Sequence, residues 1–154
     1  ETYQANKDVI DALESVATLD SRTTTLCASY DGLRWDMDGE PLDDHGKQYL
    51  ETPRHWGCRS THIPVISKLD ELDKKAKAKG LTIPKATRAS VDGPQPATTS
   101  MDKWLKKQST ERQDMIVGGK QKGDLYRLGK LELKDFTNRR GDPLTIEELK
   151  NKGK

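Results

Sequence analysis

The sequence predicts an α+β fold: a small antiparallel sheet with a flanking helix, followed by a linker and short C-terminal helices. Residues 33–37 and 60–66 alternate between apolar and polar as strands do, and Asp38-Gly39 is a strong signal for a hairpin turn. In the last third, apolar residues instead recur at helical spacing behind capping residues. Only 32% of the chain is hydrophobic, which predicts a small core.

The first predicted segment, residues 1–66, begins with an amphipathic helix over residues 6–14. Val9, Ile10 and Leu13 recur there at the spacing of one helix face. A short strand over residues 16–19 would follow the helix.

The rest of this segment reads as turns and short strands. Pro41 limits the return strand of the hairpin, and Pro64 favours a sheet edge for the last strand. We expect Trp35 and Trp56 in the core, because a small sheet needs large apolar side chains. The remaining elements, in order, are a turn at 20–23, a helical turn near 26–30, a strand at 33–37, a loop at 43–48, a tight loop at 55–59 and a strand at 60–66.

Residues 67–99 form the second predicted segment. Residues 68–79 read as a charged helix whose acidic residues offset its lysines, which is typical of a solvated face. Residues 81–99 hold three prolines and little to bury, so we expect an extended linker.

The third segment, residues 100–154, reads as short helices. Ser100, Ser109 and Thr145 are helix-capping residues, and Thr145 with Glu148 makes a capping box. We expect Trp104 to anchor these helices. They are too short to be stable alone in water, so they must pack on each other, on the first segment or on a partner.

Charge and composition narrow the function classes. The chain has 27 basic and 25 acidic residues, and this balance by itself does not indicate nucleic-acid binding. Arg139 and Arg140 form a modest basic cluster, a solvated surface by default, with a DNA-backbone contact as the alternative. No apolar run has the length of a membrane helix, and we expect no signal peptide, because no such segment opens the sequence. Because the chain starts at Glu1, we expect a fragment or a processed product.

Cys27, His55 and Cys58 are the strongest chemical candidates. His55 and Cys58 have the spacing of a chelating pair, and Cys27 could supply a second thiolate, which suggests a zinc site. Two cysteines are too few for a secreted disulfide scaffold, so an intracellular origin with reduced or metal-bound thiols is expected. Three states stay open at this point: a metal site, a pair of buried thiols, or a disulfide.

A structural zinc ion needs a fourth ligand, which the sequence does not single out. The candidates are His45, His62, Asp20 and Asp31. An alternative of another class is a nuclease-like toxin or other hydrolase that uses His55 with Asp20 or Asp31 in acid–base chemistry. The structural interpretation of the same residues is that Asp20 caps a turn, Arg22 pairs with a carboxylate and Asp31 closes a turn. On this interpretation the chain is not an enzyme and has no catalytic residues.

Two segments together resemble a known family. The pattern D-x-R-T, a Cys or His, D-G, and later P-x-H-x-x-C-R-[CS]-x-x-x-P-V is similar to that of the phage Mu F-like head morphogenesis family, the minor head proteins of tailed phages, in its C-terminal part. The matching residues are Asp20, Arg22, Thr23, Cys27, Asp31, Gly32, Pro53, His55, Cys58, Arg59, Ser60, Pro64 and Val65. Further similar stretches are residues 101–105, 113–114, 125–131 and 143–149.

The resemblance implies a minor capsid protein that binds portal or capsid protein in head assembly or genome delivery. It places the protein in the virion, and in the host cytoplasm during assembly, and implies no established enzyme activity. Many relatives have Cys where Ser60 stands, a departure that weakens a metal site of the Cys-Arg-Cys form. Related domains also occur in toxin proteins.

Overall fold

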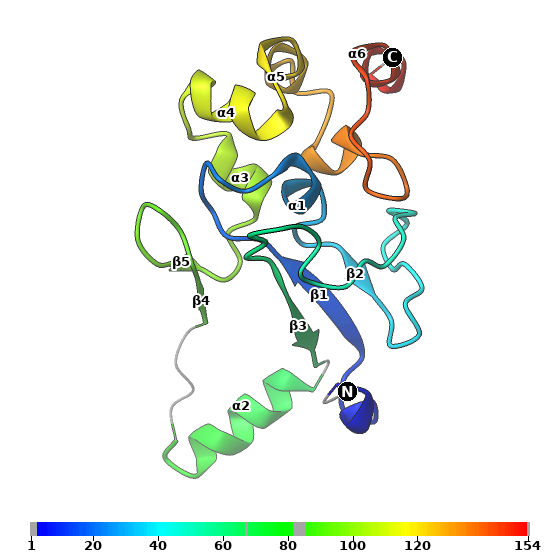
Figure 1. Cartoon of the computed structure of the whole chain (residues 1–154). Coiled ribbons are helices and arrows are strands. Elements are labelled where there is room, and N and C mark those ends of the chain that lie inside the picture. Colours follow the sequence, from blue (N-terminus) through cyan, green and yellow to red (C-terminus); the bar gives the residue numbers. More distant parts are fainter. Residues whose placement is uncertain (1–2, 67, 82–85, 154) are drawn as a thin grey trace.

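The structure is a computed structural model that describes residues 3–66, 68–81 and 86–153. It confirms the α+β class (Figure 1). Residues 67 and 82–85 of the predicted middle segment lie outside the described residues. No helix in the described ranges combines the length and apolar character needed to cross a membrane.

A three-stranded antiparallel sheet with the order β2-β1-β3 lies just below the centre of the molecule in Figure 1. Its central strand, β1 (Ala12–Val16), pairs along its length with β3 (Thr61–Val65) and more briefly with β2 (Arg34–Trp35). The predicted edge position of Pro64 is therefore correct. Pro41 makes only an isolated bridge to Trp35, so the return strand is as short as predicted.

The helix predicted over residues 6–14 is wrong. A short 3-10 helix, η1 (Gln4–Asn6), precedes a turn, and β1 begins at Ala12. A nine-residue helix gains little stability on its own, whereas the strand has five paired positions with β3. The pairing also buries Ala12 and Leu13, so a partner distant in sequence overrides the local spacing.

The C-terminal helices form the upper half and pack around α1 (Thr25–Ser29) (Figure 1). Their predicted capping residues are correct, because the side chains of Ser100, Ser109 and Thr145 each accept a backbone N–H of the first helical turn. The elements are α3 (Met101–Leu105), α4 (Thr110–Val117), α5 (Lys120–Arg127), η2 (Leu133–Phe136) and α6 (Ile146–Lys152).

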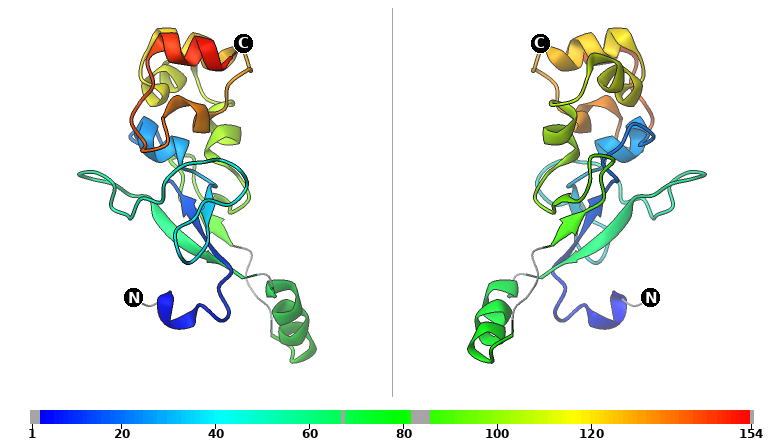
Figure 2. Two further views of the ribbon diagram at one scale, coloured as in Figure 1. Left: turned by 90° about the vertical axis from the view of Figure 1, so that its right-hand side faces the viewer. Right: turned by 90° about the vertical axis from the view of Figure 1, so that its left-hand side faces the viewer.

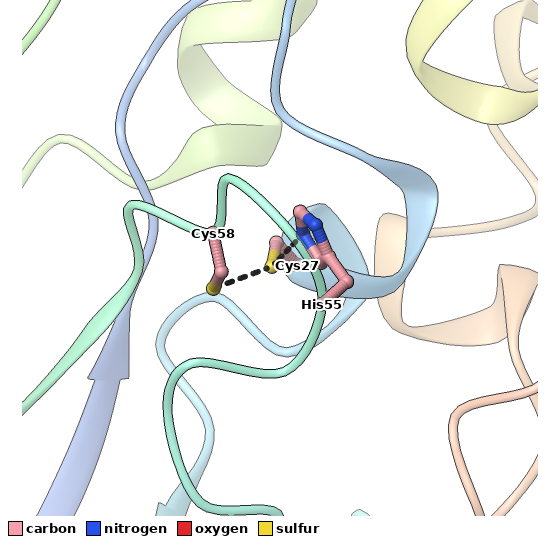
Figure 3. Close-up of side chains that lie close together, drawn as sticks. All are labelled: Cys27, His55 and Cys58. Atoms are coloured by element: carbon pink, nitrogen blue, oxygen red, sulfur yellow. Dashed lines mark hydrogen bonds between the residues drawn. The ribbon is translucent and has the colours of Figure 1, made fainter.

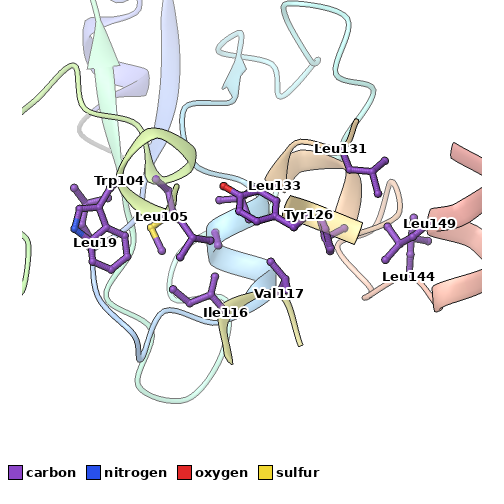
Figure 4. Close-up of a cluster of buried hydrophobic side chains, with 13 residues drawn as sticks. Leu19, Trp104, Leu105, Ile116, Val117, Tyr126, Leu131, Leu133, Leu144 and Leu149 are labelled. Carbon is purple, nitrogen blue, oxygen red and sulfur yellow. The ribbon is translucent and has the colours of Figure 1, made fainter. Parts of the chain in front are cut away.

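The main hydrophobic cluster joins the first and last parts of the chain (Figure 4). Leu19 and Ala28 lie in it beside residues of the C-terminal helices, including Trp104. A second cluster of Tyr30, Leu33 and Trp35 lies against the sheet. Trp35 and Trp104 are thus buried as predicted.

Trp56 is the exception among the tryptophans, because its side chain is 101% exposed. The prediction that it lies in the core is wrong. It lies in the tight turn at 55–58 on the loop between β2 and β3, where the neighbouring side chains leave it uncovered.

The middle segment contains two distinct parts. The charged helix α2 (Leu69–Ala78) is confirmed and extends away from the core (Figure 1). Within residues 86–99, however, β4 (Thr87–Arg88) and β5 (Gln95–Pro96) form a small hairpin, and Leu19 bridges to Ser90. This part of the predicted linker is therefore structured against the first segment.

Candidate metal centre

The loop of residues 54–59 brings His55 and Cys58 together through a tight turn. The N–H of Cys58 donates to the carbonyl oxygen of His55 over 3.1 Å, which closes a four-residue turn. The third residue of that turn, Gly57, has a φ of 72°, a conformation that favours glycine. The first and last side chains of such a turn lie close together, so the His-x-x-Cys spacing becomes a chelating pair.

Cys27 reaches this pair from the first turn of α1. Thr24 begins the helix and accepts the N–H of Cys27 with its side chain. The Cys27 sulfur lies 3.2 Å from Nε2 of His55 and 3.6 Å from the sulfur of Cys58 (Figure 3). The three ligand atoms all lie within 4.8 Å of one another, close enough to hold a metal ion.

These separations fit a tetrahedral ion better than a disulfide. Zinc bonds of about 2.3 Å to sulfur and about 2.0 Å to nitrogen, at tetrahedral angles, place two sulfurs about 3.8 Å apart and a sulfur about 3.5 Å from a nitrogen. The observed 3.6 Å and 3.2 Å lie within a few tenths of an ångström of these values. A disulfide needs about 2.05 Å between sulfurs, and both cysteines are free.

The hydrogen bonds of His55 leave the ring nitrogen of the cluster free to coordinate. Nδ1 lies 2.9 Å from the carbonyl oxygen of Trp56, which can only accept, so Nδ1 carries the proton. Nε2 then has its lone pair directed towards the sulfur of Cys27 and the hydroxyl of Thr24. A backbone carbonyl that fixes the tautomer in this way is the usual support of a metal-binding histidine.

The two thiols have different environments. Burial raises the pKa of Cys27, and the neighbouring Cys58 adds to the shift. Burial also acts against the thiolate of Cys58, but hydrogen bonds from the backbone of Arg54 and Ser60 and from Cys27 outweigh it and lower its pKa. The side chain of Ser60 acts to lower the pKa of both thiols and lines a small pocket with Cys27 and His55, which places it beside the ligand set.

None of the four residues proposed from sequence as a fourth ligand joins the cluster within the described parts of the chain. Nε2 of His45 bonds the carbonyl of Arg34, and Nε2 of His62 lies 3.1 Å from the guanidinium of Arg54. The two carboxylates, Asp20 and Asp31, pair with arginines instead.

Asp20 ties the two motif segments together. Its carboxylate forms a two-point ion pair with Arg59 and also accepts the N–H of Arg22. The hydrogen bonds from Arg59 lower the pKa of this carboxyl group. The turn role predicted for Asp20 is correct. The predicted pairing of Arg22 with a carboxylate is not found in the described residues, where Arg59 is the ion-pair partner of Asp20.

Asp31 is the most deeply buried carboxylate of the motif. Both it and its partner Arg88 are almost fully buried, and their closest oxygen and nitrogen are 2.5 Å apart. The same carboxylate accepts the N–H groups of Ala17 at 2.9 Å and of Met101 at 2.6 Å. Asp31 therefore fastens β1, the β4–β5 hairpin and the start of α3 to the end of α1.

Sequence reasoning missed Thr24, Ser60 and Arg88. Thr24 carried a local signal, because a threonine before a helical turn is a capping residue. Ser60 lies inside the motif, but from the sequence it is only a departure from the family pattern. Arg88 lies 57 positions from Asp31 in a proline-containing stretch, where no local pattern indicates a buried ion pair.

The comparisons with known proteins give no relative from which a role could be carried over. No protein-family model matches the chain, and no significant match is found among curated proteins or solved structures.

Proposed function

We propose that this chain is a minor head component of a tailed bacteriophage that binds portal or capsid protein, and that Cys27, His55 and Cys58 hold a zinc ion that stabilises the binding module. On this proposal it acts in the virion, and in the host cytoplasm during assembly, and it is not an enzyme. The proposal rests on the motif that resembles the Mu F-like family.

The observation that carries the proposal is the convergence of the two motif segments. Residues 28 to 39 positions apart meet in one unit, through the Cys27, His55 and Cys58 cluster and through the Asp20–Arg59 ion pair. Contacts of this kind give a structural reason for these residues to occur together as a motif. The motif links α1 to the loop that leads into β3.

Zinc suits this link on chemical grounds. Two thiolates and one imidazole are preferred zinc ligands, and the distances from the Cys27 sulfur to the other two ligand atoms are close to those of a tetrahedral site. Cys27, His55 and Cys58 would hold the ion, and the fourth ligand would come from outside this set of three. The bound ion would supply a cross-link that a chain with a small core otherwise lacks.

A binding role fits the carboxylates better than the hydrolase alternative does. Acid–base hydrolysis through His55 needs Asp20 or Asp31 free to face a substrate. Each carboxylate is instead bonded to an arginine and to backbone N–H groups. Such pairing leaves neither carboxylate free to exchange a proton with a substrate or a water molecule.

The test is binding to purified portal rings from the phage that encodes the chain. We expect the chain to sediment with the rings in a density gradient, and we expect it to leave plasmid DNA intact in the presence of zinc or magnesium. Failure to bind the portal and capsid proteins would refute the proposal. Cleavage of the plasmid that His55→Ala abolishes without unfolding the chain would support the hydrolase alternative instead.

A further inference from the structure

Trp56 stands apart from every other aromatic side chain of the molecule in the described ranges. Its side chain is fully exposed, although Trp35 and Trp104 are buried. The loop that precedes β3 and carries it projects from one side of the molecule (Figure 2, blue-green). A side chain with this much apolar surface gains no free energy from folding when it stays in water.

The loop that presents Trp56 is fixed on both sides. On one side the guanidinium of Arg54 bonds Ser15 and His62 and lies 4.9 Å from the centre of the Tyr30 ring. On the other side Arg59 pairs with Asp20.

The tip itself is held as well. His55 donates to the backbone carbonyl of Trp56, and both His55 and Cys58 contact Cys27. Trp56 is therefore displayed on an ordered support and not on a loose loop.

We propose that Trp56 is an anchor residue that inserts into an apolar pocket of a partner protein. Tryptophan is the residue type most enriched among the few side chains that dominate protein interfaces. A rigid loop loses little conformational entropy on binding, so more of the burial free energy appears as affinity. This inference deepens the proposed function, on which it rests, by naming the contact through which the chain binds the portal.

The charges around the loop favour a protein over a nucleic acid or an anionic membrane. Those ligands need several free cations, but Arg54 and Arg59 are both engaged within the chain. Arg22 is exposed and lines a small pocket with His55 and Gly57. The complementary partner surface is therefore an apolar pocket bordered by a carboxylate that pairs with Arg22.

The experiment measures binding of Trp56→Ala to purified portal rings. We expect the Kd to rise at least about 30-fold, the effect of losing a dominant interface residue. Met115→Ala, which removes another exposed apolar side chain on α4, serves as the matched control and should change the Kd by less than about twofold. Because no side chain covers Trp56, both variants should keep the wild-type melting temperature.

Fluorescence gives a second readout of the same contact. Trp35 and Trp104 are buried, so iodide should quench mainly Trp56 in the free chain, and portal rings should protect it. Equal binding of wild type and Trp56→Ala would overturn this inference and leave the proposed function intact. If the wild-type chain does not bind portal rings, both the inference and the proposed function are overturned. Both are also overturned if single-stranded DNA or anionic vesicles protect Trp56 from iodide and portal rings do not.

Discussion

Replacing Asp31 with Asn should destabilise the chain severely. The change keeps the shape of the side chain but leaves the charge of Arg88 buried and unpaired, since both side chains are almost inaccessible. The Asp31 carboxylate accepts hydrogen bonds from the N–H groups of Ala17, Met101 and Arg88. In asparagine one of the two oxygens becomes an NH2 group, which would face these donors and could accept none of their hydrogen bonds. Breaking a buried pair from one side costs about 3–5 kcal/mol. Arg88 keeps bonds to the carbonyls of Ala17 and Thr99, so we expect about 3 kcal/mol.

Urea unfolding measures this effect. With a slope of about 2 kcal/mol per molar urea, the midpoint of Asp31→Asn should fall by about 1.5 M. A double-mutant cycle isolates the pair. Arg88→Met removes the unpaired charge, so the double variant should be more stable than the sum of the single losses predicts, by about 1–3 kcal/mol. A loss below about 1 kcal/mol for Asp31→Asn, or strict additivity in the cycle, would refute the reasoning.

Three further predictions concern other parts of the molecule. Burial, and then Arg54, lower the pKa of His62 to about 4, so the unfolded chain binds an extra proton between about pH 6.5 and 4. Up to about 3 kcal/mol of stability should be lost over that range on acidification. Urea unfolding at pH 6.5 and at pH 4 measures it, and in His62→Gln the loss between the two pH values should be smaller by this amount. Ser60→Cys adds a third thiol beside the ligand set and should tighten zinc binding at least about tenfold in chelator competition; unchanged affinity would place position 60 outside the site. Gly141 has a φ of 91°, and an added Cβ would lie 2.6 Å from Leu26, so Gly141→Ala should cost about 2–3 kcal/mol in thermal unfolding, whereas a neutral result would contradict the close packing.

The parts of the fold that depend on local chemistry could be predicted from the sequence. Ser100, Ser109 and Thr145 mark helix starts because their side chains bond amides only a few residues away. The tight loop predicted at 55–59 depends on local chemistry for the same reason, because the positive φ of Gly57 is a local requirement. The chelating pair of the candidate site followed directly from that loop.

The parts that depend on distant partners could not be predicted. The apolar spacing of residues 6–14 suits a helix, and only the pairing of β1 with β3, some fifty residues away, decides for a strand. Trp56 has the large apolar side chain that is typical of a core residue, and its exposure follows from the path of the loop that carries it. The pairing of Asp31 with Arg88, and of Asp20 with Arg59, depends on which segments the fold brings together.

The zinc content of the purified chain tests the central claim, that Cys27, His55 and Cys58 form one metal-held unit. After purification without chelators, native mass spectrometry should find about one zinc per wild-type chain. Cys58→Ser should lose the ion, while His45→Ala, which removes a histidine outside the cluster, should retain it. A folded wild-type chain free of metal, or full zinc in Cys58→Ser, would contradict the account.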